Sequence, residues 1–304
     1  MTMDNTAELA DPHRHLPTAR EGSIVLADGR TLGHGRYGAA DGPVVVVLDG
    51  PGSRGLGRAA ARAAQELGVT LLVPDRPGFG ASTPAPGRSI ADVGEDLLAL
   101  VRSLGITRFG ILGQSGGTPY ALALAVAGGD AVTGLAFAGI ISPLGEPDAL
   151  EDVRGPMRTM FQLSRRAPWL LRPLLGAVAR KTLKDPEAAA RAYAKDVPPA
   201  DRAALEDPTL WAIHTVTSAE AVAAPAAFAR EARLLARPWG VDPAAVTAPA
   251  ALWVGALDPV HPPVMSRRMA ARLGGAPVTV VSDAATFGLV SVYPDILRHA
   301  TGRA

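Results

Sequence analysis

Short apolar runs alternate along the chain with longer segments in which apolar residues recur at helical spacing. The most regular run, Val44 to Leu48, is apolar on both faces, as a central strand of a parallel sheet must be. Further short runs lie at 70–73, 109–112, 135–138, 251–254 and 278–281, and the stretch 22–38 favours an antiparallel hairpin. Helical patterns occupy 58–67, 89–104, 120–126 and 294–300. This alternation predicts βαβ units and an α/β fold with a mostly parallel sheet.

The strand pattern stops between residues 142 and 237. This stretch is rich in Ala, Arg and Leu and is interrupted repeatedly by proline, which predicts several short helices separated by turns. An all-helical insertion in an alternating chain is best explained as a cap over the carboxyl edge of the sheet, where open α/β sheets bind ligands. The predicted organisation is a flexible tail at 1–20, a core at 21–141 and 238–304, and a helical cap at 142–237.

A sharp turn between a predicted strand and a predicted helix carries the clearest chemical signal. Residues 113–117 read Gly-Gln-Ser-Gly-Gly, a G-x-S-x-G pattern that holds a serine hydroxyl, here Ser115, out at the turn. Such a serine needs a general base, expected after the last strand. The segment 283–289 reads Asp-Ala-Ala-Thr-Phe-Gly-Leu and contains no histidine.

Five motifs in order resemble the α/β-hydrolase fold, in particular its capped bacterial members, over about residues 32–297. They are Asp-Gly-Pro-Gly-Ser-Arg at 49–54, Asp-Arg-Pro-Gly-Phe-Gly-Ala-Ser at 75–82, the elbow at 113–117, Arg-Pro-Trp-Gly at 237–240 and Trp-Val-Gly-Ala-Leu-Asp at 253–258. The resemblance implies an eight-stranded, mostly parallel sheet flanked by helices, with a helical cap insertion. It also implies that Ser115 is the nucleophile, that Asp258 is the triad acid, and that the Gly50 loop and the Gly116 amide form an oxyanion hole.

Two departures from the family pattern affect the expected chemistry. Thr286 stands where the family has its catalytic histidine, and Asp49-Gly50 stands in the oxyanion loop where the family has His-Gly. An ionised Asp49 would oppose a developing oxyanion. Asp49 is therefore a candidate general acid or base, or an aspartate that caps the following turn. Asp258, without a histidine to orient, is expected to bond Thr286, a backbone amide or a ligand.

Two other histidines are candidate substitute bases. His261 lies three residues after Asp258 between prolines, where an exposed loop histidine is the simpler interpretation, and His214 lies on a predicted cap helix, where packing is the simpler one. The cap is expected to enclose an apolar pocket, lined among others by Gln114, Phe287 and Trp211.

Composition narrows the function classes. The 304 residues carry a net charge of +1, which gives no electrostatic footprint for nucleic acid or an anionic membrane. The absence of cysteine excludes thiol chemistry, and the sequence has no zinc motif, P-loop or dinucleotide fingerprint, so we expect no metal and no cofactor. No apolar run approaches a membrane span and the N-terminus lacks a signal-like apolar segment, so we expect a cytoplasmic protein that acts on a small apolar molecule.

These features favour an enzyme on a hydrolase scaffold that performs a non-hydrolytic step in bacterial specialised metabolism, such as a cyclisation, isomerisation or elimination. A pocket can accelerate such a step by holding a reactive conformer, without a nucleophile. The alternatives are a serine esterase that uses Ser115 with His261 or His214, and a non-catalytic ligand-binding protein on the same scaffold. The sequence does not determine the oligomeric state.

Overall fold

The core of the protein is a single eight-stranded sheet. A computed structural model describes residues 15–145, 149–153 and 155–303. Its strand order is β1-β2-β4-β3-β5-β6-β7-β8, with antiparallel pairing at β1–β2 and β2–β4 and parallel pairing elsewhere. The strands are β1 (Arg20–Val25), β2 (Thr31–Gly38), β3 (Val44–Leu48), β4 (Thr70–Pro74), β5 (Phe109–Ser115), β6 (Val132–Ile140), β7 (Ala250–Gly255) and β8 (Val278–Val281). The predicted α/β fold with a mostly parallel sheet is confirmed.

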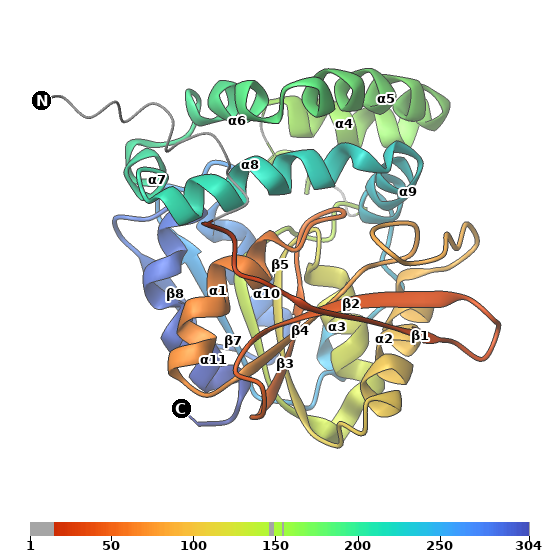
Figure 1. The fold of residues 1–304 in the computed structure, drawn as a ribbon, viewed down its shortest axis with the longest axis vertical. Helices are drawn as coiled ribbons and strands as arrows, with labels where there is room; N and C mark the ends of the chain where they lie inside the picture. Colours follow the sequence, from red (N-terminus) through yellow and green to blue (C-terminus); the bar gives the residue numbers. More distant parts are fainter. Residues whose placement is uncertain (1–14, 146–148, 154, 304) are drawn as a thin grey trace, which may run out of the picture.

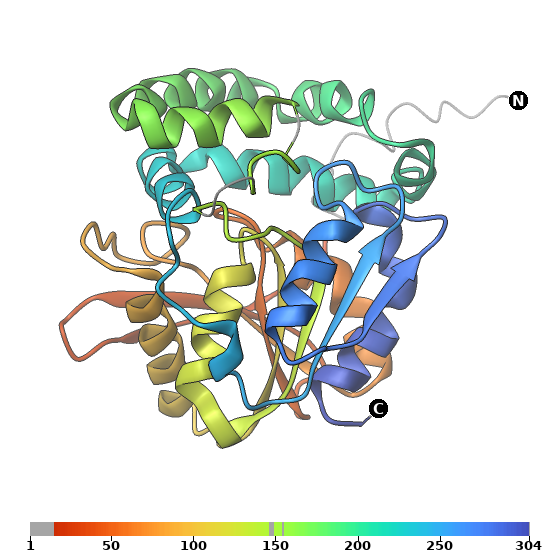
Figure 2. The ribbon, with the colours of Figure 1, turned by 180° about the vertical axis from the view of Figure 1, so that it is seen from behind.

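Helices cover both faces of this sheet (Figures 1 and 2). They are α1 (Gly55–Glu66), α2 (Ile90–Ser103), α3 (Thr118–Gly128), α10 (Pro263–Arg272) and α11 (Tyr293–Ala300). Side chains of α1 and α11 share one buried apolar cluster with the sheet, and those of α2, α3 and α10 share another. Because the central strands are packed on both faces, they must be apolar throughout, which is why β3 reads as an unbroken aliphatic run.

The cap consists of six helices that follow one another between β6 and β7. They are α4 (Gly155–Arg166), α5 (Pro168–Lys184), α6 (Pro186–Ala194), α7 (Pro199–Ala204), α8 (Pro208–Ala223) and α9 (Pro225–Leu235). Five of them begin with proline, which suits a first helical residue because its missing N–H would have no partner there. In Figure 1 the cap lies above one end of the sheet, with α8 and α9 towards the core. The predicted tail at 1–20 lies mostly outside the described residues, and Arg20 already belongs to β1.

Two buried or half-buried ion pairs join the cap to the core. Arg76, from the turn after β4, contacts both carboxylate oxygens of Glu231 on α9 at 2.5 and 3.1 Å. Arg58 on α1 pairs with Glu220 on α8 at 2.6 and 2.7 Å. Each pair has two parallel contacts, the geometry in which arginine binds carboxylate most specifically. The cap is thus held over the sheet by directional contacts as well as by packing.

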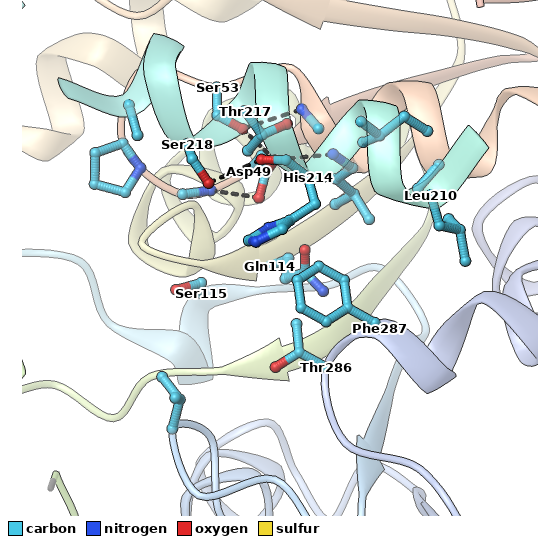
Figure 3. Close-up of a pocket in the computed structure, with 18 of the residues that line it drawn as sticks. Asp49, Ser53, Gln114, Ser115, Leu210, His214, Thr217, Ser218, Thr286 and Phe287 are labelled. Atoms are coloured by element: carbon cyan, nitrogen blue, oxygen red, sulfur yellow. Dashed lines mark hydrogen bonds between the residues drawn. The ribbon is translucent and has the colours of Figure 1, made fainter. Parts of the chain in front are cut away.

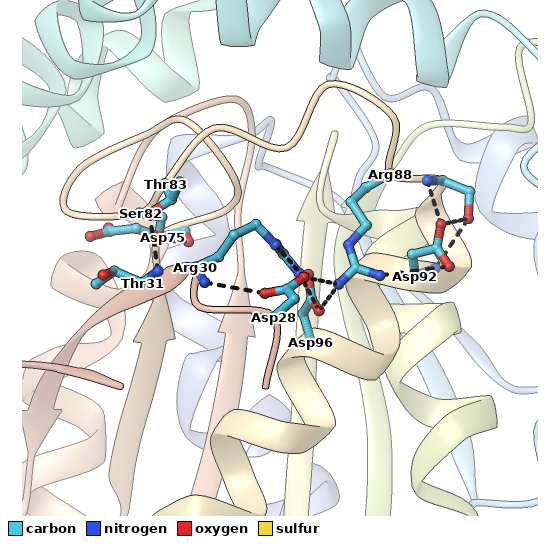
Figure 4. A network of polar contacts seen from close by, with 10 residues as sticks. Asp28, Arg30, Thr31, Asp75, Ser82, Thr83, Arg88, Asp92 and Asp96 are labelled. Atoms are coloured by element: carbon cyan, nitrogen blue, oxygen red, sulfur yellow. Dashed lines mark hydrogen bonds and ion pairs between the residues drawn. The ribbon is translucent and has the colours of Figure 1, made fainter. Parts of the chain in front are cut away.

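A network of charged residues ties the edge hairpin to the start of α2 (Figure 4). Arg30 contacts Asp28 and Asp96 at 2.8 Å, and Arg88 contacts the same two carboxylates at 3.0 and 2.8 Å. The helix itself begins with a capping box formed by Ser89 and Asp92. These contacts hold the edge hairpin against α2, and we assign them a structural role.

The turn after β5 has the strained geometry of a nucleophile elbow. Ser115 is the only non-glycine residue with positive φ among those that the structure describes, at 48°. A side chain in that region is disfavoured and persists only where the surroundings enforce it. Gly117 shows how tightly the turn is enclosed, because a Cβ at this position would lie 2.0 Å from the carbonyl oxygen of Leu48.

This crowding predicts different effects for two neighbouring substitutions. Gly117→Ala should destabilise the fold by about 2 kcal/mol or more, since the nearest atoms are backbone and must shift. Gly116→Ala should change stability by less than about 1 kcal/mol, because its Cβ would meet only ordinary contacts at 3.4 Å. Urea unfolding of both variants measures the difference. Equal losses would show that the elbow relaxes around the added methyl group.

Candidate functional site

A cavity of about 280 Å³ lies between the carboxyl edge of the sheet and the cap. It is lined by Asp49, which follows β3, by Ser115, the last residue of β5, and by Thr286 and Phe287 (Figure 3). Helix α8 supplies much of the roof through Leu210, Ile213, His214, Thr217, Ser218 and Ala221. These positions recur at helical spacing and therefore share one face of α8.

Trp211 does not line this cavity, contrary to our expectation. Its ring lies 5.9 Å from that of His214, which does line the cavity. Gln114 and Phe287 do line the cavity. The amide nitrogen of Gln114 is buried and has no hydrogen-bond partner among the described residues. The cavity therefore contains one donor that is free to bind a ligand oxygen.

Ser115 is half-buried at the cavity floor, and its hydroxyl makes no hydrogen bond to the described residues. The hydroxyl is thus free to contact a ligand. Thr286, at the position where the sequence resemblance led us to expect a histidine, donates a hydrogen bond of 2.7 Å to Oδ2 of Asp258. A threonine hydroxyl is not a base near neutral pH, so this contact cannot activate Ser115.

His261 is buried, not exposed as its position between prolines suggested. Only 4% of the residue is accessible, and its Nδ1 lies 3.1 Å from Oδ2 of Asp258. Its backbone amide also donates to Oδ1 of Asp258, at 2.9 Å. The turn that contains both residues therefore brings the imidazole back onto the carboxylate three positions earlier in the chain.

The environment keeps Asp258 ionised. Burial acts to raise the pKa of Asp258, but the charge of His261 and hydrogen bonds from His261 and Thr286 outweigh it, so the pKa lies well below its usual value. An ionised carboxylate can only accept hydrogen bonds, so Nδ1 of His261 must carry a proton to bond it. In neutral imidazole this leaves a lone pair on Nε2.

His261 and Ser115 line the same cavity. Nε2 of His261 is buried and has no hydrogen-bond partner among the described residues. The ring lies against Gly139, where a Cβ would be 3.4 Å from Nδ1. Gly139 is in β6, which separates β5 from β7. The imidazole is thus positioned over the strand that lies between the serine and the aspartate.

His214 is packed differently. Its Nε2 lies 3.3 Å from the carbonyl oxygen of Ala190, and its ring lies 5.2 Å from the rings of both Tyr193 and Phe287. Burial lowers the pKa of His214 below its usual value, which favours the neutral ring. A neutral imidazole that donates from Nε2 to a carbonyl and packs among aromatic rings fits a structural part of the cavity roof.

Asp49 forms the centre of a turn. Its carboxylate accepts hydrogen bonds from the Gly50 amide at 2.6 Å, the Ser53 hydroxyl at 2.7 Å and the Leu56 amide at 2.8 Å (Figure 3). This geometry supports the turn-capping alternative for Asp49 over the acid or base alternative. It also means that the Gly50 amide points to its neighbour's carboxylate, whereas the family resemblance implied an oxyanion-hole donor.

The other amide expected in the oxyanion hole is available. The Gly116 N–H has no acceptor among the described residues, and a Cβ on Gly116 would lie 3.7 Å from Cα of Gly50. Arg76 supports this loop from beneath, since its guanidinium donates to the carbonyl oxygens of Asp49 and Gly50 at 2.9 and 2.6 Å. The same cation also lies over the ring of Tyr120. This role of Arg76 in holding the Asp49–Gly50 loop was not predicted from the sequence.

Asp201 is a second residue whose role the sequence did not reveal. It lies on cap helix α7, is buried, and accepts hydrogen bonds of 3.0 Å from the amides of Phe287 and Gly288. Burial raises the pKa of Asp201 above its usual value, although these backbone hydrogen bonds act in the opposite direction. Asp201 thereby fixes the segment that follows Thr286. Its only sequence signal was its place in the first turn of a helix after two prolines.

Among the described residues, no group of three or more His, Asp or Glu side chains could hold a metal ion. None of the helices described is both long and apolar enough to cross a bilayer.

Comparisons with a protein-family model and with solved structures identify the same fold. The model of the alpha/beta hydrolase fold matches residues 42–290. Solved structures with the same fold include a thermophilic esterase from Thermogutta terrifontis (22% identity, TM-score 0.61, 92% of this chain and 97% of that chain covered) and the enol-lactonase from Burkholderia xenovorans (18%, 0.64, 91% and 99%). Another is an epoxide hydrolase from Vigna radiata (16%, 0.65, 93% and 96%). No curated protein matches the sequence, and at these identities the structures establish the fold alone.

Proposed function

This chain belongs to the alpha/beta hydrolase fold family, and on that premise we propose that it is a serine hydrolase whose catalytic histidine has moved to His261. The reaction is hydrolysis of a carboxylic ester or lactone with a mostly apolar body. The observation that carries the proposal is the placement of His261, which is bonded to Asp258 through Nδ1, lines the cavity together with Ser115 and has a buried Nε2 without a hydrogen-bond partner among the described residues.

In this mechanism Ser115 Oγ attacks the ester carbonyl while Nε2 of His261 accepts its proton. Asp258 holds the ring in the required tautomer and stabilises the imidazolium. The leaving alcohol takes the proton from His261, and water then hydrolyses the acyl-enzyme with the same histidine as base. In the structure Ser115 and His261 are not hydrogen-bonded, and such contacts often tighten only when substrate binds.

The developing oxyanion would be bound by the Gly116 amide. Because the Gly50 amide is occupied by Asp49, we assign the second donor to the unpartnered amide nitrogen of Gln114. The apolar part of the substrate would lie against the α8 side of the cavity, with Leu210, Ile213 and Ala221. The described activities of the esterase and the lactonase with this fold are in line with this substrate class.

A fluorophosphonate probe tests the proposal, because it reacts only with an activated serine. We expect stoichiometric labelling, mapped by mass spectrometry to Ser115, together with turnover of p-nitrophenyl esters. Heat-denatured protein is the control for nonspecific labelling. Absence of both labelling and turnover in folded protein would contradict the proposal.

A second candidate is the non-hydrolytic enzyme that the sequence favoured, and Asp49 is the observation for it. The Asp49 carboxylate lines the cavity and takes up the Gly50 amide, so negative charge stands where a hydrolase needs oxyanion donors. A cyclisation, isomerisation or elimination of an apolar molecule in bacterial specialised metabolism needs no such hole. If the fluorophosphonate probe does not label Ser115 but apolar ligands bind tightly, the result would favour this non-hydrolytic enzyme or a protein that binds its ligand without catalysis.

A further inference from the structure

The outward face of cap helix α5 exposes an unusual number of large apolar side chains. Trp169 is 72% accessible and Leu174 is 53%, and Leu170 and Val178 are also exposed. Leu171, Leu175 and Ala179 of the same helix are buried, and Leu171 and Leu175 belong to an apolar cluster with residues of α9. The buried residues of α5 already pack the helix against the rest of the cap. The exposed apolar residues are therefore not needed for that packing.

Basic residues stand on both sides of this apolar face. Arg165 and Arg166 end α4, immediately before it, and Arg180, Lys181 and Lys184 lie in the last part of α5. From residue 155 to residue 184 the chain has seven Arg or Lys and no Asp or Glu, although its overall net charge is only +1. None of these basic side chains pairs with a carboxylate in the part of the chain that the structure describes. The segment 155–184 therefore carries a concentrated positive charge that no described carboxylate neutralises.

Helices α4 and α5 form the outer layer of the cap, and α8 and α9 lie between them and the sheet (Figures 1 and 2). No described element covers them. A flat object can therefore approach the apolar face and the basic residues at the same time.

We propose that this face, Trp169 to Lys184 with Arg165 and Arg166, docks the protein onto the surface of an anionic lipid bilayer. A helix with Trp and Leu on one side and Lys and Arg around them lies in the interface plane, with its apolar side chains at the acyl boundary and its cations at the phosphates. The net charge of +1 argues against an anionic membrane partner only if the charged residues are evenly distributed over the surface. Here the basic residues are concentrated in one segment.

A second copy of this chain fits the face less well. In a two-fold symmetric dimer the same patch meets itself, so the basic residues of the two copies would face one another. Such like charges oppose association, whereas anionic headgroups neutralise them. The lipid surface is the partner that satisfies the apolar and the charged residues together.

Vesicle co-sedimentation tests the proposal with full-length protein. We expect binding to vesicles of phosphatidylglycerol and phosphatidylcholine, weakened by high salt, and little binding to phosphatidylcholine alone. The triple variant Arg180→Gln, Lys181→Gln, Lys184→Gln should lower the partition constant on the order of a hundredfold, since each cation near the surface contributes roughly a fivefold attraction. Leu170→Ser with Leu174→Ser should also reduce binding, while circular dichroism shows an unchanged fold.

Two further measurements test whether α5 inserts into the bilayer and whether membrane binding is independent of catalysis. Tryptophan fluorescence should shift to shorter wavelength on vesicle binding, and Trp169→Phe should remove the shift. Activity against a soluble ester should be unchanged in the surface variants, because none of them touches the cavity, so this inference stands or fails independently of the proposed hydrolysis. The proposal would be overturned by equal binding to neutral and anionic vesicles, or by no binding to either. It would also be overturned if the free protein self-associates and the Leu170 and Leu174 changes abolish that self-association.

Discussion

His261→Ala should lower kcat for ester hydrolysis by at least about 10³-fold, with little change in KM. The reason is that His261 is the histidine that Asp258 orients, and Thr286, which donates to Asp258, cannot accept a proton from Ser115. The matched control is His214→Ala, which removes the other cavity histidine. Because Nε2 of His214 is already bound to a carbonyl, we expect that variant to change KM and leave kcat within about tenfold.

Combining substitutions distinguishes a catalytic unit from a structural contact. Asp258→Asn should also lower kcat strongly, because the tautomer and orientation of His261 depend on this carboxylate. The double variant His261→Ala, Asp258→Asn should be no slower than the worse single variant, since members of one catalytic unit are not additive. Steady-state kinetics with a p-nitrophenyl ester measures all four proteins. Additive losses, or a His214 variant as slow as the His261 variant, would refute the assigned roles.

Glu231→Gln should destabilise the protein by about 3 kcal/mol, a loss typical of breaking a buried ion pair from one side. Arg76 and Glu231 are both almost fully buried, at 4% and 6% side-chain exposure. Burial acts to lower the pKa of Arg76, but the charge and hydrogen bonds of Glu231 outweigh it and the pKa is raised, so the guanidinium is charged. Removal of Glu231's charge leaves that cation buried without its counterion.

The control for this variant is Glu21→Gln, which breaks the contact of Arg54 with an exposed glutamate. An exposed pair of this kind contributes only about 0–1 kcal/mol. In thermal unfolding, we expect the Glu231 variant to lose roughly 5–10 °C and the Glu21 variant little. Since Arg76 also holds the carbonyls of Asp49 and Gly50, the Glu231 variant should show reduced kcat as well. Equal melting temperatures for the two variants would show that the pair does not hold the cap.

Local patterns predicted most of the fold for a clear reason. A strand buried on both faces has to be apolar at every position, so the run at 44–48 marks β3 directly. Proline at the first position of five cap helices likewise records where those helices begin. The G-x-S-x-G pattern located the elbow, because its small residues are required where a Cβ would collide with backbone. Helix α10 was not predicted, since its apolar positions are few.

The sequence by itself determined that a serine stands at an elbow, that an aspartate follows β7, and that position 286 has no histidine. Only the tertiary structure decided what those residues contact. A proline-flanked His261 is indistinguishable from an exposed loop residue until the turn folds it onto Asp258 and over Gly139. Arg76 likewise reaches Glu231 across 155 positions of the chain. Secondary structure follows from neighbours in sequence, whereas a site depends on side chains that meet only when distant segments pack together.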